Sequence, residues 1–228
     1  MITISQVYRA IWLSLVVSGS ATLISAVIGI PLGTALAEFS FRGKRAALTV
    51  VHAFMGLPPV VIGVFAFLII RRSGPLGGLG LIYTITAMVI VQVILATPII
   101  AGFTHASLEG VDPRLGLQAR SLGATRVQAV LVKTREARAG MVAAVIAGFG
   151  RVIAEVGAVT IVGGAINSKT DVLTTIAVKL TRQGFPALAL LVGTILIIMA
   201  IIINVFLTRL QSGKWRRETE KRVMGYVS

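Results

Sequence analysis

The chain has 228 residues, of which 56% are apolar and only 13% are charged, and its mean hydropathy is +0.92. Soluble domains carry about 25% charged residues, so this composition excludes an ordinary soluble domain. The formal net charge of +14 would suit a nucleic-acid-binding protein, but uncharged apolar runs longer than about 20 residues exclude that class and indicate a membrane protein.

Apolar segments long enough to cross a bilayer occur five times along the chain. About 20 helical residues cross the apolar core, and stretches 10–37, 46–70, 73–108 and 183–208 contain no charged residue, while 141–164 is interrupted only by Arg151 and Glu155. The turn-like sequence SGPLGGLG at 73–80 places the start of the third span near residue 81. We therefore predict a single all-α, multi-pass transmembrane domain over 1–228, with spans at about 11–37, 46–70, 81–103, 141–164 and 185–208.

The first span is predicted to be retained. Its apolar stretch is longer than the 7–15 residues of a signal-peptide core, and the basic cluster FRGKR follows at 41–45. Gly29 and Gly33 within it form a GxxxG pattern, which permits close helix approach.

The second span carries two prolines in its middle. Proline removes a backbone donor and interrupts a helix, and backbone groups freed at membrane depth must face protein or a water-filled cavity. Gly56, Pro58, Pro59 and Gly63 are therefore candidates for a kink that lines a pore. A helix bent only for packing is the alternative.

The long loop at 104–140 is predicted to form a compact element of two helices. Asp112 and Pro113 suit the start of a helix, and Leu115, Ala119 and Leu122 recur at helical spacing before Gly123. Glycine adopts positive φ or allows close approach of another surface. The alternative is an amphipathic helix lying on anionic lipid headgroups.

In the fourth span, Arg151 and Glu155 are one helical turn apart and can form an ion pair that faces the bundle interior. Ionisable residues within a membrane are functional candidates. A glutamate would repel an oxyanion, so we favour a gating or packing role over substrate contact by Arg151. The following segment, 165–187, is expected to be a polar outer loop.

Basic residues predict the orientation. Segments 38–45, 104–140 and the basic tail 209–228 hold 15 of the 22 Lys and Arg residues. Because Lys and Arg concentrate in cytoplasmic loops, the N-terminus is expected outside and the C-terminus inside, in the plasma (inner) membrane. Most of the net charge thus reports topology rather than a polyanionic partner, and no nucleic acid is expected.

One segment of the 104–140 loop resembles a known family. Residues 117–124 read LQARSLGA and are similar to the EAA loop of type I ABC importer permeases, whose usual form is close to EAAxxLGA. Ala119, Leu122 and Gly123 match, whereas Leu117 replaces the usual Glu and Gln118 the first Ala. The usual downstream I-x-L-P is absent.

Further segments resemble the tungstate branch of the molybdate, tungstate and sulfate permeases. They include FRGKRAALTVVHAFMGLPPVVIG at 41–63, RRSGPLG at 71–77, REAR at 135–138, GFGRVIAEVGAVTIVGG at 148–164 and VLTTIAV at 172–178. The likeness extends over about residues 10–208 and implies a MetI-like permease fold and tungstate import, with molybdate or sulfate as the nearest alternatives.

In that family the short helix docks in a cleft of the ATPase and transmits its closure to the membrane helices. The resemblance therefore implies ATPase-coupling residues at Leu115, Gln118, Ala119, Arg120, Ser121, Leu122, Gly123, Ala124 and Thr125. It also implies a second copy of the chain, two cytoplasmic ATP-binding subunits and an external tungstate-binding protein, besides membrane lipid.

No cofactor is expected on this chain itself. Neither GxxxxGK[ST] nor GxGxxG occurs in the sequence, so ATP is expected on a partner subunit. The chain has no cysteine, and its two histidines, His52 and His105, have no carboxylate cluster nearby, so no metal site is predicted. No catalytic set is apparent, although a small membrane enzyme or a scaffold with a lipid-binding loop is the rival from another class.

Overall fold

The computed structural model describes the backbone of residues 3–225 and the side chains of residues 3–209. Apart from Arg209, the predicted basic tail 209–228 lies outside the described side chains. Helices account for all regular structure in the described part of the chain: α1 (Ile4–Glu38), α2 (Lys44–Gly56), α3 (Pro59–Ile70), the short 3-10 helix η1 (Gly77–Leu79), α4 (Ile85–Glu109), α5 (Pro113–Ser121), α6 (Arg126–Glu136), α7 (Arg138–Ile153), α8 (Gly157–Gly163), α9 (Leu173–Arg182) and α10 (Pro186–Gly225).

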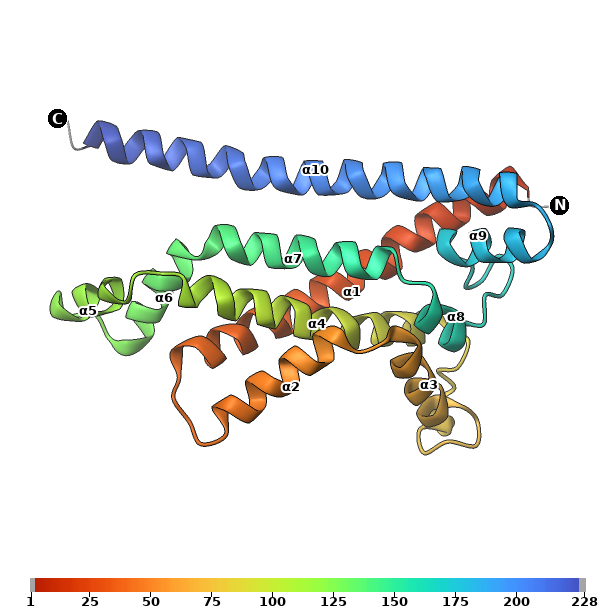
Figure 1. The fold of residues 1–228 in the computed structure, drawn as a ribbon, viewed down its shortest axis with the longest axis horizontal. Coiled ribbons are helices and arrows are strands. Elements are labelled where there is room, and N and C mark those ends of the chain that lie inside the picture. The colour runs from red at the N-terminus through yellow and green to blue at the C-terminus, as the bar shows by residue number, and fades with distance from the viewer. Residues whose placement is uncertain (1–2, 226–228) are drawn as a thin grey trace.

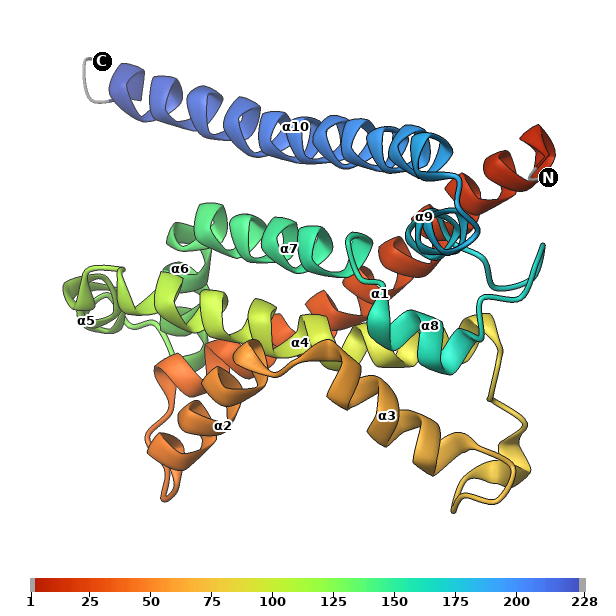
Figure 2. The ribbon, with the colours of Figure 1, turned by 45° about the vertical axis from the view of Figure 1, so that its right-hand side comes forward.

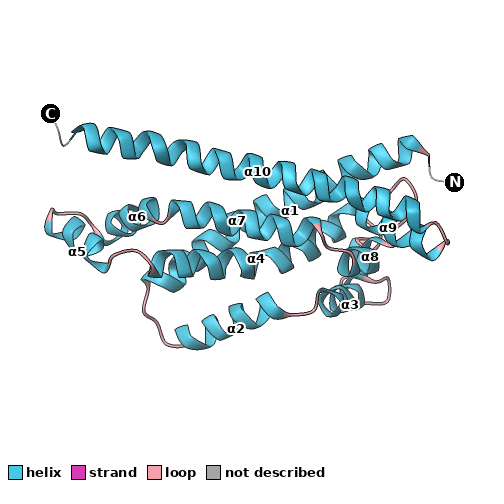
Figure 3. Cartoon of the chain, turned by 45° about the horizontal axis from the view of Figure 1, so that its top comes forward, coloured by secondary structure: helices cyan, strands magenta, loops and turns pink. Residues whose placement is uncertain are grey.

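The molecule is an elongated bundle built around α1, α4 and α7, which pack against one another (Figure 1). Helices α5 and α6 lie at one end of the bundle, and α8 and α9 lie toward the other. Helix α10 runs along one side, and α2 and α3 diverge from the opposite side (Figure 2). The view in Figure 3 shows this all-helical arrangement from another direction.

Three helical stretches have the length and apolarity to cross a membrane, namely α1, α4 and Pro186–Arg209 of α10. Two bent pairs, α2 with α3 and α7 with α8, bring the number to five if each pair forms one span. The bends are 100° and 59°. The segment 141–164, predicted as one span, ends one helix at Ile153 and begins another at Gly157, so Arg151 and Glu155 do not share one continuous helix.

The α1–α4 contact depends on the small residues of the GxxxG pattern. A β-carbon on Gly29 would lie 3.0 Å from the carbonyl oxygen of Thr97, and one on Gly33 would lie 2.8 Å from the Thr104 β-carbon. Both glycines are buried. The GxxxG pattern therefore marks the point at which α1 and α4 cross with their backbones in close contact. This crossing lies at the centre of the α1, α4 and α7 bundle.

The polar segment 165–187 is not only a loop. It contains α9, whose Thr174 and Thr175 are buried, and the Thr175 hydroxyl accepts a hydrogen bond from the Val172 backbone N–H at 2.9 Å. Hydroxyl groups that serve as caps are well suited to burial because each finds a backbone partner. The polarity of this segment thus reflects capping and packing as well as exposure.

Candidate functional site

The predicted two-helix element is present at residues 112–136. We call it the coupling element, after the role that the resemblance implies for it. Asp112 caps α5 by accepting a hydrogen bond from the Arg114 N–H at 2.8 Å, and Pro113 occupies the first turn. The predicted helix start is thereby confirmed. Gly123 has φ of +87°, a conformation that a side chain disfavours.

Hydrogen bonds around Gly123 explain how α5 ends. The Ala124 N–H donates to the Ala119 carbonyl at 3.0 Å, and the Gly123 N–H donates to the Arg120 carbonyl at 3.0 Å. These two bonds form a Schellman motif, which needs a left-handed residue at the position of Gly123. Thr125 then starts α6 at once, with Gln128 completing a reciprocal cap. The tight turn fixes the angle between the two short helices.

The predicted coupling residues divide into an inner and an outer set. Leu115 packs against the buried cluster of Leu108, Val111, Ala137 and Met141, and Ala119 and Ala124 are half-buried. Leu122 does not continue this inner face as its spacing suggested, because it is the residue that ends α5 and is 89% exposed. The remaining members of the set are exposed, namely Gln118, Arg120, Ser121, Gly123 and Thr125.

A contact that the sequence did not reveal joins the coupling element to the end of α1. Lys133 Nζ donates to Glu38 Oε1, and the two side chains are only 18% and 12% exposed. The Arg126 guanidinium lies 5.2 Å from the centre of the Phe39 ring, within cation–π range. These partners are about 90 positions apart in the sequence, and no local pattern pairs them.

The second candidate region is the break between α7 and α8. Arg151 Nη1 and Glu155 Oε2 are 3.1 Å apart, so the ion pair predicted from their spacing forms. Glu155 also accepts a hydrogen bond from the Ala158 N–H at 3.0 Å and is 5% exposed. A carboxylate at a helix start compensates the unsatisfied N–H groups there. Glu155 therefore caps α8, and it lies in the break rather than on a continuous helix.

Neighbouring helices satisfy the other backbone groups freed at this break. Gln92 of α4 donates its side-chain N–H to the Val152 carbonyl at 3.0 Å, and Thr174 of α9 donates its hydroxyl to the Glu155 carbonyl at 3.0 Å. Irregular backbone at membrane depth requires such partners. The break is thus held by hydrogen bonds from two neighbouring helices, α4 and α9.

The proline-containing bend separates α2 from α3 at Leu57 and Pro58. Leu57 is extended, as expected for a residue before proline, and Pro59 begins α3. Gly56 and Pro58 are exposed and Pro59 is half-buried. Gly63 is buried within α3, where a β-carbon would lie 2.7 Å from the Ala158 α-carbon. The structure thus gives Gly63 a packing contact with α8.

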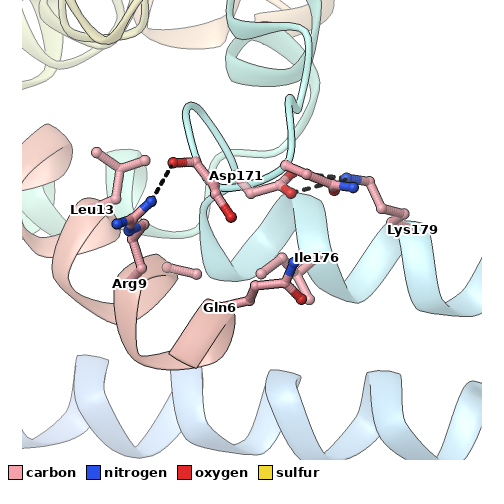
Figure 4. A pocket seen from close by; sticks show the side chains of 9 residues that line it. Gln6, Arg9, Leu13, Asp171, Ile176 and Lys179 are labelled. Carbon is pink, nitrogen blue, oxygen red and sulfur yellow. Dashed lines mark hydrogen bonds and ion pairs between the residues drawn. The ribbon is translucent and has the colours of Figure 1, made fainter. Parts of the chain in front are cut away.

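At the opposite end of the bundle, α1, α9 and the loop 164–172 enclose a cavity of about 20 Å³ (Figure 4). This volume suffices for about one water molecule. Arg9 donates to the Ser168 carbonyl at 3.0 Å, and Lys179 contacts Asp171 at 2.9 Å and Asn167 at 2.7 Å. The loop is therefore held by one cation from each helix.

Comparison with known proteins agrees with this architecture. Residues 29–216 match the family described as binding-protein-dependent transport system inner membrane component. The tungstate uptake system permease protein TupB of Peptoclostridium acidaminophilum is 37% identical, over 90% of each chain. A probable anion ABC transporter permease protein of Haloferax volcanii is also 37% identical, over 84% of each chain.

Among solved structures, a chain of the MetNI methionine ABC transporter in an inward-facing crystal form has a TM-score of 0.77. It shares 22% sequence identity, and the match covers 92% of this chain and 96% of that one. This likeness shows the MetI-like fold. The chain therefore belongs to the family of binding-protein-dependent transport system inner membrane components, which are the permease subunits of ABC importers and not enzymes.

Proposed function

We propose that this chain is the membrane-spanning subunit of an ATP-driven importer of tungstate, with molybdate and sulfate as the nearest alternative solutes. The tungstate permease of P. acidaminophilum, which is similar over nearly the whole chain, supports this solute. The proposed topology places the N-terminus outside and the coupling element in the cytoplasm, in keeping with the distribution of Lys and Arg.

The working assembly would contain two copies of this chain, two ATPase subunits and an external tungstate-binding protein. Large apolar side chains lie exposed along α3 and α10, including Phe65, Leu68, Ile198 and Phe206. Membrane lipid and a second copy are both suitable to cover such surfaces. ATP would bind only to the partner ATPase, and this chain would supply the path and the coupling element.

The observation that carries the proposal is the exposed apolar end of the coupling element. Leu117 is 64% exposed and Leu122 is 89% exposed. Leu117 lies on α5, whose two ends are capped, and Leu122 is the C-cap residue of that helix. A protruding apolar surface of this kind can bind in a cleft of a partner protein, because a few central, buried side chains contribute most of the binding energy at interfaces.

We expect Leu122→Asp to abolish stable association with the ATPase. A buried interface does not tolerate a desolvated, unpaired carboxylate, and loss of one such anchor costs about 2 kcal/mol or more, which is about 30-fold in affinity. Co-purification of the ATPase from mild detergent measures this. Because Leu122 is exposed in this chain, the variant should melt at the unaltered temperature.

A matched control is Leu79→Asp, since Leu79 is 63% exposed and ends η1, which lies between α3 and α4 along the chain and outside the coupling element. This variant should retain the ATPase. If Leu122→Asp also retained it, the docking role of the coupling element would be wrong. A chain that purified without any ATPase and bound anionic vesicles through α5 and α6 would instead favour the lipid-binding alternative.

The solute is tested separately, by titrating the cognate binding protein with tungstate, molybdate and sulfate. Tungstate should bind at least about tenfold more tightly, a difference of about 1.4 kcal/mol, and uptake into proteoliposomes should follow the same order. Tighter binding of molybdate or sulfate would assign the importer to that solute and leave the coupling proposal intact.

A further inference from the structure

Helix α1 contacts the coupling element through side chains, although the two segments are not consecutive along the chain. Its last residue, Glu38, pairs with Lys133, and the following residue, Phe39, lies under the guanidinium of Arg126. Both cations belong to α6. Because each side chain of the Glu38–Lys133 pair is less than one-fifth exposed, water screens the attraction less than at a fully exposed pair.

Apolar packing supports the same contact. Ile30 and Ala37 of α1 pack against the buried cluster of Leu108, Val111, Ala137 and Met141, and Leu115 of α5 packs against the same cluster. A displacement of the coupling element therefore reaches α1 from α6 through the Glu38–Lys133 pair and from α5 through this shared cluster. Helix α4 differs, since it continues directly into the coupling element along the chain.

The other end of α1 is fastened to the loop 164–172 and to α9. Arg9 donates to the Ser168 carbonyl at 3.0 Å, and the Ser14 hydroxyl accepts from the Leu173 N–H at 3.0 Å. Lys179 holds the same loop through Asp171, Asn167 and the Ala165 carbonyl. In Figure 4 Arg9 and Lys179 approach this loop from different helices.

Between these two ends α1 is one continuous helix of 35 residues, about 52 Å long at 1.5 Å per residue. It is supported along α4 by the close crossing at Gly29 and Gly33. Pro31 removes one backbone donor within α1 but does not end the helix. The packed face of α1 can therefore transmit displacement along its axis, because close-packed interiors have low compressibility.

We propose that α1 is a relay between the two ends of the permease. The Glu38–Lys133 pair passes displacement of the coupling element to α1, and Arg9 passes displacement of α1 to the loop 164–172. Glu38 and Lys133 are positioning residues in this scheme, since they contact neither solute nor nucleotide. The relay rests on the proposed function, in which ATPase closure moves the coupling element.

The test uses the full complex with its ATPase in proteoliposomes. The chain has no cysteine, so Lys169→Cys, at an exposed loop position, carries a single spin label. The change in its spectrum on adding a non-hydrolysable ATP analogue is measured for the otherwise unaltered chain, for Glu38→Lys, for Lys133→Glu and for the double exchange. ATPase stimulation by the loaded binding protein is measured alongside.

Each single charge reversal should reduce the stimulation at least about fivefold, which is the lower range of coupling between distant sites, and should remove the spectral change. The double exchange should restore both. Arg42→Glu reverses an exposed charge close to the end of α1, outside the Glu38–Lys133 pair, and should leave both readouts unaltered.

The relay is overturned if the single variants respond like the unaltered chain, or if the double exchange is no better than the worse single variant. Co-purification of the ATPase with no spectral change at residue 169 in the otherwise unaltered chain also overturns the relay alone. Failure of the ATPase to bind at all overturns the proposed function and the relay together. Absence of tungstate uptake counts only against the proposed solute.

Discussion

Gly33→Ala is expected to prevent assembly of a stable permease, although alanine is the better helix former. The new β-carbon would overlap the Ala101 carbonyl oxygen and lie 2.8 Å from the Thr104 β-carbon. A backbone carbonyl in a packed helix cannot rotate away, so α1 and α4 must separate. Overpacking costs about 1–3 kcal/mol in cores, and we expect the upper end here. The measurement is the melting temperature and membrane yield of the purified chain.

The same helix supplies graded controls for this prediction. At Gly29 the nearest atoms to a new β-carbon are 3.0 Å away, so Gly29→Ala should be milder. At Gly19 no neighbouring atom lies within 4 Å, and alanine should be neutral or stabilise by about 0.5–1 kcal/mol through its helix propensity. Equal melting temperatures for the Gly33 and Gly19 variants would show that the α1–α4 crossing does not limit stability.

These glycines also show how far the sequence predicts the fold. The GxxxG pattern indicates that something approaches α1 closely, but not that the neighbour is α4. Apolar runs predict the membrane spans, because the helix length needed to cross a bilayer is fixed by the thickness of the bilayer. Capping residues such as Asp112 and Gly123 predict where α5 begins and ends in the coupling element, because each acts on backbone groups a few positions away.

Contacts between distant segments account for what the sequence did not predict. The break at 154–156 needs a carboxylate from Glu155 within the break, an amide from Gln92 of α4 and a hydroxyl from Thr174 of α9, so its partners come from three separate segments of the chain. The Glu38–Lys133 pair likewise joins residues 95 positions apart. A periodic pattern reports the environment of one segment, and neither of these sites is a property of one segment.

Glu155→Ala is expected to loosen the break between α7 and α8 and to stop transport. It removes the partner of Arg151 and the acceptor of the Ala158 N–H together. Breaking a buried pair by deleting one partner costs about 3–5 kcal/mol. Arg151 is 34% exposed, so solvation offsets part of this and places the loss near the lower end. Melting temperature and solute uptake in proteoliposomes are the two measurements.

The two functions of Glu155 separate in a second pair of variants. Glu155→Gln retains an oxygen that accepts from the Ala158 N–H but removes the charge, so it should melt between the unaltered chain and Glu155→Ala. Adding Arg151→Gln removes the charge left without a partner, and the melting temperature should then recover. Glu109→Gln is the control, because that carboxylate is 62% exposed.

If the doubly neutral variant melts normally yet transports nothing, then the charges serve the movement of the break rather than its stability, because the two amides leave the cap and the packing in place. Full transport by that variant would instead make the ion pair a packing element alone.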